Sequence, residues 1–96
     1  MKIKDKHPID KAVSATLLFK GEEGTSATAL QILKDQQLKE HITKVPAMLV
    51  CITGKVIFEN EKGIKETLSS GDYVHIEPLV KHWVDGLEDS QLIVIK

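Results

Sequence analysis

Short apolar segments, each ended by glycine, proline or a polar turn, run along most of the chain. The first covers residues 12–20 and closes at Gly21-Glu22-Glu23-Gly24, a turn bracketed by glycines. The same spacing predicts further strands at 25–34, 38–43, 47–53, 56–59, 64–68, 73–76, 81–84 and 91–95. Regularly spaced short strands separated by turn residues are typical of an all-β sandwich or barrel. The pattern therefore predicts eight or nine strands and no substantial helix.

The chain is expected to form one domain. Residues 1–11 are polar and contain Pro8, so we predict an N-terminal arm or a single short turn there, with no role for His7. Residues 12–96 contain no repeat, low-complexity tract or linker and are predicted to form one β-barrel. A chain of this size buries only about two-thirds of its unfolded surface. We therefore expect a homodimer, in which more surface is buried.

Composition limits the partners and the compartment. The chain has 13 lysines, no arginine and 14 acidic residues, which argues against a nucleic-acid partner. No apolar run approaches the ~20 residues needed to span a bilayer, and no signal-like segment opens the chain. The single cysteine, Cys51, cannot form an intramolecular disulfide and is typical of a reducing compartment. These features predict a soluble cytoplasmic protein with no membrane partner.

Two histidines distant in sequence are the strongest candidates for chemistry. His82 begins a predicted strand after the segment Gly71-Asp72-Tyr73-Val74-His75-Ile76-Glu77-Pro78, and His41 precedes an apolar run that ends near Gly54. Two residues so far apart meet only if the intervening strands fold back on one another. We therefore predict an imidazole pair in the mouth of the barrel.

The spacing around His82 resembles the second motif of the small single-domain cupins, a family of jelly-roll barrels. Gly71-Asp72, Ile76, Pro78 and His82 match that motif, whereas Leu79 stands where the family usually has glycine. His41 and Gly54 match the first histidine and the glycine of the first motif. The resemblance covers residues 26–96 and implies a double-stranded β-helix, that is, a jelly-roll barrel.

The middle of the first motif departs from the family pattern. Thr43 stands where the second histidine belongs, and Ala47 stands where the glutamate belongs. The chain is similar to a divergent branch of small cupins with His, Pro and Ala at this spacing. A cupin-type centre normally offers three imidazoles and a carboxylate to a divalent ion, so the resemblance leaves only His41 and His82 as candidate metal ligands.

The apolar run at 47–53 supplies the remaining predicted pocket residues. If Ala47 faces inward, as its motif position implies, then Leu49 and Cys51 do so too. The predicted pocket is lined by Ala47, Leu49, Cys51, His41 and His82. The alternate residues, beginning with Met48, are also apolar, so we expect the second sheet or a partner subunit to cover them.

Three functions remain open from the sequence. The first is a small-molecule binding protein in which the imidazoles grip a ligand in an apolar cavity without a full metal centre or cofactor. The second is a metal-dependent isomerase or dioxygenase with a degenerate two-histidine site. The third is a dimerisation module whose pocket is filled by its own side chains. No nucleophilic serine motif, phosphate loop or paired acid and base carboxylates identifies a catalytic residue.

Overall fold

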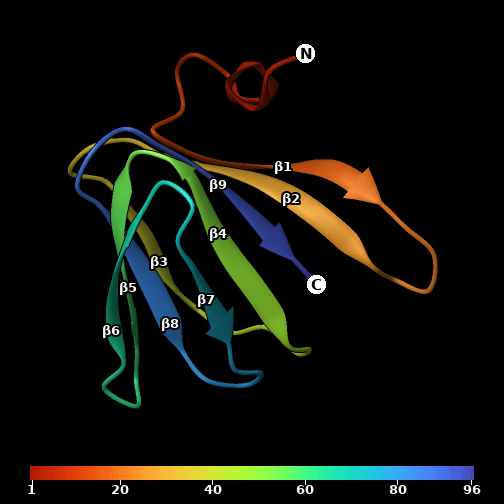
Figure 1. Cartoon of the computed structure of the whole chain (residues 1–96), viewed down its shortest axis with the longest axis vertical. Helices are drawn as coiled ribbons and strands as arrows, with labels where there is room; N and C mark the ends of the chain where they lie inside the picture. The colour runs from red at the N-terminus through yellow and green to blue at the C-terminus, as the bar shows by residue number, and fades with distance from the viewer.

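The computed structural model describes residues 1–96 as two antiparallel sheets preceded by a short 3₁₀ helix, η1 (Ile3–Lys6) (Figure 1). This arrangement confirms the predicted all-β architecture, and each predicted strand overlaps an observed one. The strands are β1 (Val13–Lys20), β2 (Ser26–Ile32), β3 (Gln37–His41), β4 (Ala47–Thr53), β5 (Lys55–Asn60), β6 (Lys65–Ser69), β7 (Tyr73–Ile76), β8 (His82–Gly86) and β9 (Ser90–Ile95). The helix η1 has 4 residues, and no helix in the chain could span a membrane.

The order of the strands in the two sheets differs from their order in the chain. One sheet has five strands in the order β1-β2-β9-β4-β7, and the other has four in the order β3-β8-β5-β6. The consecutive strands β8 and β9 therefore belong to different sheets, and β9 lies between β2 and β4. Crossovers of this kind characterise the jelly roll, in which two antiparallel sheets enclose one core.

Residues that alternate along each strand fill the space between the sheets. On β4, Ala47, Leu49 and Cys51 are buried, whereas Met48 and Val50 are only half-buried on the other face. Phe58 of β5 is the largest fully buried side chain and packs opposite this row. The two sheets together bury Leu30, Ile32, Ala47, Leu49, Cys51, Val56, Phe58, Leu68, Ile76, Val84 and Leu92 in one core.

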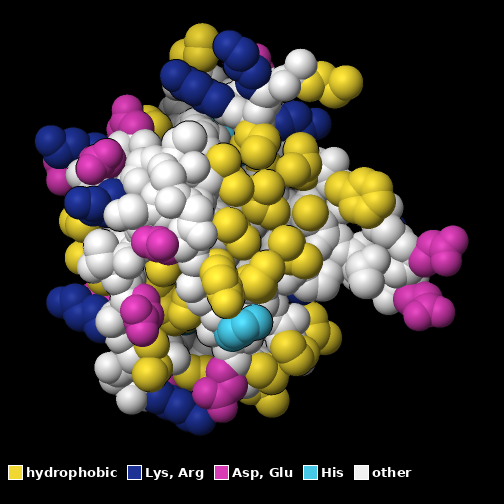
Figure 2. All heavy atoms as spheres, viewed as in Figure 1, with side chains coloured by type: hydrophobic (Ala, Val, Ile, Leu, Met, Phe, Trp, Pro, Cys, Tyr) yellow, Lys and Arg dark blue, Asp and Glu magenta, His cyan; other side chains and the backbone are white.

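The outer face of the five-stranded sheet is also apolar. Met48 and Val50 of β4 lie opposite Ile95 and Ile93 of β9, and Val50 also lies opposite Tyr73 of β7. Figure 2 shows hydrophobic side chains gathered over β4 and β9, with charged side chains around rather than within the group. We call this surface the outer apolar face.

The N-terminal arm packs against the same sheet at β1 and β2. The Nδ1 atom of His7 lies 2.9 Å from the hydroxyl of Ser14, and the amide of Gln31 donates a hydrogen bond to the Lys11 carbonyl. His7 is 9% exposed, its Nε2 atom is buried without a hydrogen-bond partner, and burial lowers its pKa. His7 is thus a packing residue of the arm, a role that the polar sequence around it did not indicate.

The loop between β7 and β8 contains a leucine in a conformation that suits glycine. Leu79 has a φ of +65°, and its backbone N–H donates to the Thr43 carbonyl at 2.8 Å. Left-handed backbone costs a residue with a side chain about 1–2 kcal/mol. The departure from the cupin motif at Leu79 therefore places a leucine on backbone that glycine adopts more easily.

Replacing Leu79 with glycine should stabilise the protein. Because the Leu79 side chain is 67% exposed, little apolar burial is lost, and relief of strain should exceed the added flexibility of the unfolded chain by about 0.5–1 kcal/mol. Urea unfolding of Leu79→Gly measures this gain. Leu87→Gly is the matched control, since Leu87 is exposed without a positive φ, and it should lose stability. A loss in both variants would contradict the strain argument.

Candidate functional site

The antiparallel pairing of β3 with β8 brings the two predicted histidines together. His41 lies opposite His82 in the strand register, after an irregularity in β3 that follows Leu38. The centroids of the two rings are 4.1 Å apart, and the ring planes are inclined by 59°. His82 is 2% exposed and faces the interior, whereas His41 is exposed at the rim.

Packing and one hydrogen bond fix the orientation of His82. Its Nδ1 atom lies 3.2 Å from the Val80 carbonyl, which can only accept, so Nδ1 carries the proton. The ring also stacks on Phe58, with centroids 5.7 Å apart. Nε2 makes no hydrogen bond within the chain and is left as an acceptor. Burial lowers the pKa of His82, the Val80 hydrogen bond partly opposes this shift, and the nearby charges of His41 and Lys96 add to it.

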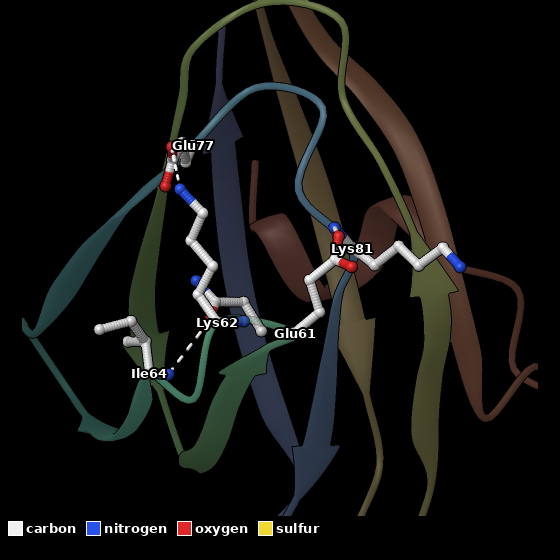
Figure 3. A network of polar contacts seen from close by, with 6 residues as sticks. Glu61, Lys62, Ile64, Glu77 and Lys81 are labelled. Carbon is white, nitrogen blue, oxygen red and sulfur yellow. Dashed lines mark hydrogen bonds and ion pairs between the residues drawn. The ribbon is translucent and has the colours of Figure 1, made fainter.

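Polar contacts with the β5–β6 turn hold the segment that leads into His82. Glu61 binds Lys81 twice, since its backbone N–H donates to the Lys81 carbonyl at 2.9 Å and its carboxylate accepts from the Lys81 N–H at 2.6 Å. Lys62 forms an ion pair with Glu77 at 2.7 Å, on the same turn (Figure 3). The turn thus contacts both sides of the Pro78 corner, through the backbone of Lys81 and the side chain of Glu77. Glu77 points to this surface pair and not toward the imidazoles.

The imidazole pair borders a cavity of about 170 Å³ between the two sheets. This volume is several times the ~30 Å³ that a water molecule occupies in the liquid. Most of the wall is aliphatic, and the polar groups come from five residues. The lining consists of Ala15, Thr28, Leu30, Leu38, His41, Thr43, Leu49, Ile76, His82, Val84, Val94 and Lys96.

Three of the five pocket residues predicted from the sequence line this cavity: His41, His82 and Leu49. Ala47 and Cys51 face inward as predicted, but they pack in the core and do not line the cavity. Cys51 lies toward the far end of β4, with its Sγ atom 3.7 Å from the Gly54 carbonyl.

The Cys51 thiol is protonated at neutral pH. Burial raises its pKa, and the nearby carboxylates of Asp72 and Glu88 raise it further. A thiol without a basic neighbour is a poor nucleophile. Cys51 therefore contributes packing to the core.

The sequence alone did not identify the part of the cavity wall formed by β1, β2 and β9. Val94 of β9 lies opposite Thr28 of β2, and both line the cavity together with Lys96, which directly follows β9. Alternation places each side chain on a face of its own strand. It does not reveal that β9 inserts between β2 and β4, and this insertion is what brings Lys96 near His82.

The side chains present do not fit a cupin-type metal centre. Thr43 and Ala47 replace two of the usual ligands, and the Thr43 hydroxyl donates to the Val45 carbonyl at 2.9 Å. No three His, Cys, Asp or Glu side chains come together anywhere in the chain. Two imidazoles without a carboxylate provide fewer ligands than catalytic and structural sites normally use.

The two-sheet topology and the imidazole pair at the cavity define a cupin-type jelly roll, and comparison with solved structures confirms this fold. A cupin superfamily protein from Desulfitobacterium hafniense superposes with a TM-score of 0.82 at 11% identity, over 98% of this chain and 84% of that one. A conserved protein of unknown function from Streptococcus pyogenes gives a TM-score of 0.80 at 14% identity, over 99% and 82% of the two chains.

KdgF from Halomonas sp. is also similar, with a TM-score of 0.78 at 19% identity over 93% of this chain and 82% of that one. No family model matches the sequence, and no curated protein matches it. At these identities the likeness establishes the cupin fold, because such barrels carry many unrelated functions. Function has to be argued from the cavity itself.

Stability should decrease when the pH falls below about 6.5. Burial lowers the pKa of His82 and His7 from 6.5, so the unfolded chain binds more protons between the lowered and the ordinary values. The free energy of unfolding should be at its full value above 6.5 and should fall as the pH drops through the lowered values. Urea unfolding at a series of pH values measures this slope.

Variants identify the groups responsible for the slope. His7→Gln and His82→Gln should each make the dependence of unfolding free energy on pH shallower. His75→Gln, at an exposed position, serves as the control and should keep the wild-type slope. If neither His7→Gln nor His82→Gln changes the slope, other titratable groups determine the pH dependence of stability.

Proposed function

We propose that this protein binds a small molecule in the cavity beside His41 and His82, without a full metal centre. The observation that carries the proposal is a cavity of about 170 Å³ with a mostly aliphatic wall and two adjacent imidazoles in its lining. Ligand sites commonly combine a mostly apolar wall with a few polar groups that fix orientation. The buried, free Cys51 supports a reducing, cytoplasmic location as part of the proposal.

A screen of small neutral fragments by NMR tests whether the cavity accepts ligands. Chemical-shift changes should concentrate on the methyl groups of Leu49, Val84 and Val94, which line the cavity. Val94→Phe should fill part of the space and weaken binding at least tenfold, whereas Ile57→Phe, on the outer face of the other sheet, should not. Shifts spread over the surface, or equal binding by both variants, would contradict the proposal.

Metal analysis tests the alternative of a metal-dependent enzyme. Protein purified without a histidine tag should contain far less than one transition-metal ion per chain, because no three potential ligand side chains come together in it. The comparison is a His41→Ala, His82→Ala double variant, which should show the same low content. Near-stoichiometric metal in the wild type that disappears in the double variant would overturn the metal-free proposal.

We further propose that two copies associate through the outer apolar face. The centre of this face, around Val50 and Ile93, carries no charged side chain. A second copy therefore brings no like charge against it. A charged partner would find no group of opposite charge there. Tyr73 and Ile95 are 59% and 44% exposed on this face. Exposed contiguous apolar surface of this kind marks protein contacts.

Sedimentation velocity tests the homodimer. The wild type should sediment as a dimer at micromolar concentration, and Val50→Glu should sediment as a monomer because it places two charges in the contact. Thr67→Glu, on an exposed edge strand of the other sheet, should remain dimeric. Circular dichroism verifies that both variants are folded. A monomeric wild type, or a folded dimeric Val50→Glu, would refute this interface.

A further inference from the structure

The charged and ionisable groups that line the cavity have one sign. Lys96, His41 and His82 are the only titratable side chains of the lining, and no aspartate or glutamate contributes to it. Lys96 forms no ion pair with any carboxylate of the chain. A lysine beside two imidazoles, with no acidic side chain in the lining, forms a site for a negatively charged group.

The rest of the cavity is suited to hydrocarbon. Leu30, Leu49, Val84 and Val94 face one another from both sheets, and Ile76 closes the wall from β7. The Thr43 hydroxyl is engaged with the Val45 carbonyl, so it is not a free donor for a ligand. The lining therefore separates into an aliphatic part and a cationic part.

We propose that the cavity binds a short aliphatic carboxylate, whose charged group lies at Lys96 and the imidazole pair and whose hydrocarbon fills the aliphatic part. This inference rests on the proposed small-molecule function and adds the chemical class of the ligand. The volume of about 170 Å³ limits the ligand to a few carbon atoms. A longer chain has to extend past the exposed His41 into solvent.

Binding of a carboxylate should bring a proton into the site. The Nδ1–H of His82 is committed to the Val80 carbonyl, so neutral His82 offers Nε2 only as an acceptor. A carboxylate is also only an acceptor, and the two groups repel until a proton lies between them. Lys96 lowers the pKa of His82, and the negative charge of the ligand offsets this effect. Binding of the ligand therefore favours the protonated imidazole. β1, β2, β4 and β7 contribute no titratable group to the lining, so the proton has only His41 or His82 to occupy.

Isothermal titration calorimetry and NMR with a matched pair of probes test the ligand class. Sodium 3-methylbutanoate and 3-methylbutanamide have the same shape but differ in charge. The carboxylate should bind at least tenfold more tightly than the amide and should shift the cavity methyl groups. Lys96→Gln should reduce carboxylate affinity about tenfold and leave amide affinity unchanged, while Lys34→Gln, an exposed lysine outside the cavity, should change neither.

The outcomes separate this inference from the proposed function. Equal affinity for carboxylate and amide within the cavity would overturn the ligand class and leave small-molecule binding intact. Carboxylate binding that Lys96→Gln does not weaken would also overturn it. If neither probe nor any neutral fragment shifts the cavity methyl groups, the proposed function fails as well.

Calorimetry in two buffers of different ionisation enthalpy tests the proton. Carboxylate binding near neutral pH should be accompanied by proton uptake, and a His41→Gln, His82→Gln double variant should abolish this uptake. The imidazole ¹³C–¹H signals of His41 and His82 report independently which ring becomes charged. Binding with no proton uptake would refute the part assigned to the imidazoles.

Discussion

The register between β3 and β8 is the constraint on which the site depends. Antiparallel pairing places His41 opposite His82, and a one-residue slip would turn every side chain of β3 to the other face of its sheet. Other elements reinforce this register. Glu61 binds the backbone of Lys81 just before β8, and Phe58 stacks on the His82 ring. The imidazole pair is therefore held by strands and a turn, which position side chains more rigidly than a free loop does.

The cavity shows how the same fold can present different chemistry after a few substitutions. Thr43 is buried and bonded to the backbone, and Ala47 has become part of the core. Both positions retain structural roles without offering a ligand to a metal. What remains is an uncharged imidazole beside an aliphatic wall, with Lys96 as the nearest cation. The balance of charge in the cavity thus favours an anion over a divalent cation.

Local pattern was enough to predict the strands and the faces of their side chains, but not the order of strands within each sheet. The run Ala47–Thr53 has the predicted bounds, and its buried residues alternate as expected. The imidazole pair was expected because two family motifs converge on it. Lys96 was not expected at the cavity, because its place there depends on β9 lying between β2 and β4. Cys51 was correctly predicted to face the interior, but it packs in the core and does not line the cavity. Alternation shows which face of a strand a side chain occupies, but not how far along the barrel the cavity reaches.

The central place of β9 has a consequence for biosynthesis. In the five-stranded sheet β9 joins the β1–β2 hairpin to β4 and β7, and no direct pairing connects β2 with β4. While the chain leaves the ribosome, the two halves of this sheet stay separate, each with an unpaired edge, until residues 90–95 emerge. The five-stranded sheet therefore cannot close before β9 is available. Until then the edges of β2 and β4 that β9 later covers are open to pairing with other chains, which makes β9 the strand that protects this sheet from misassembly.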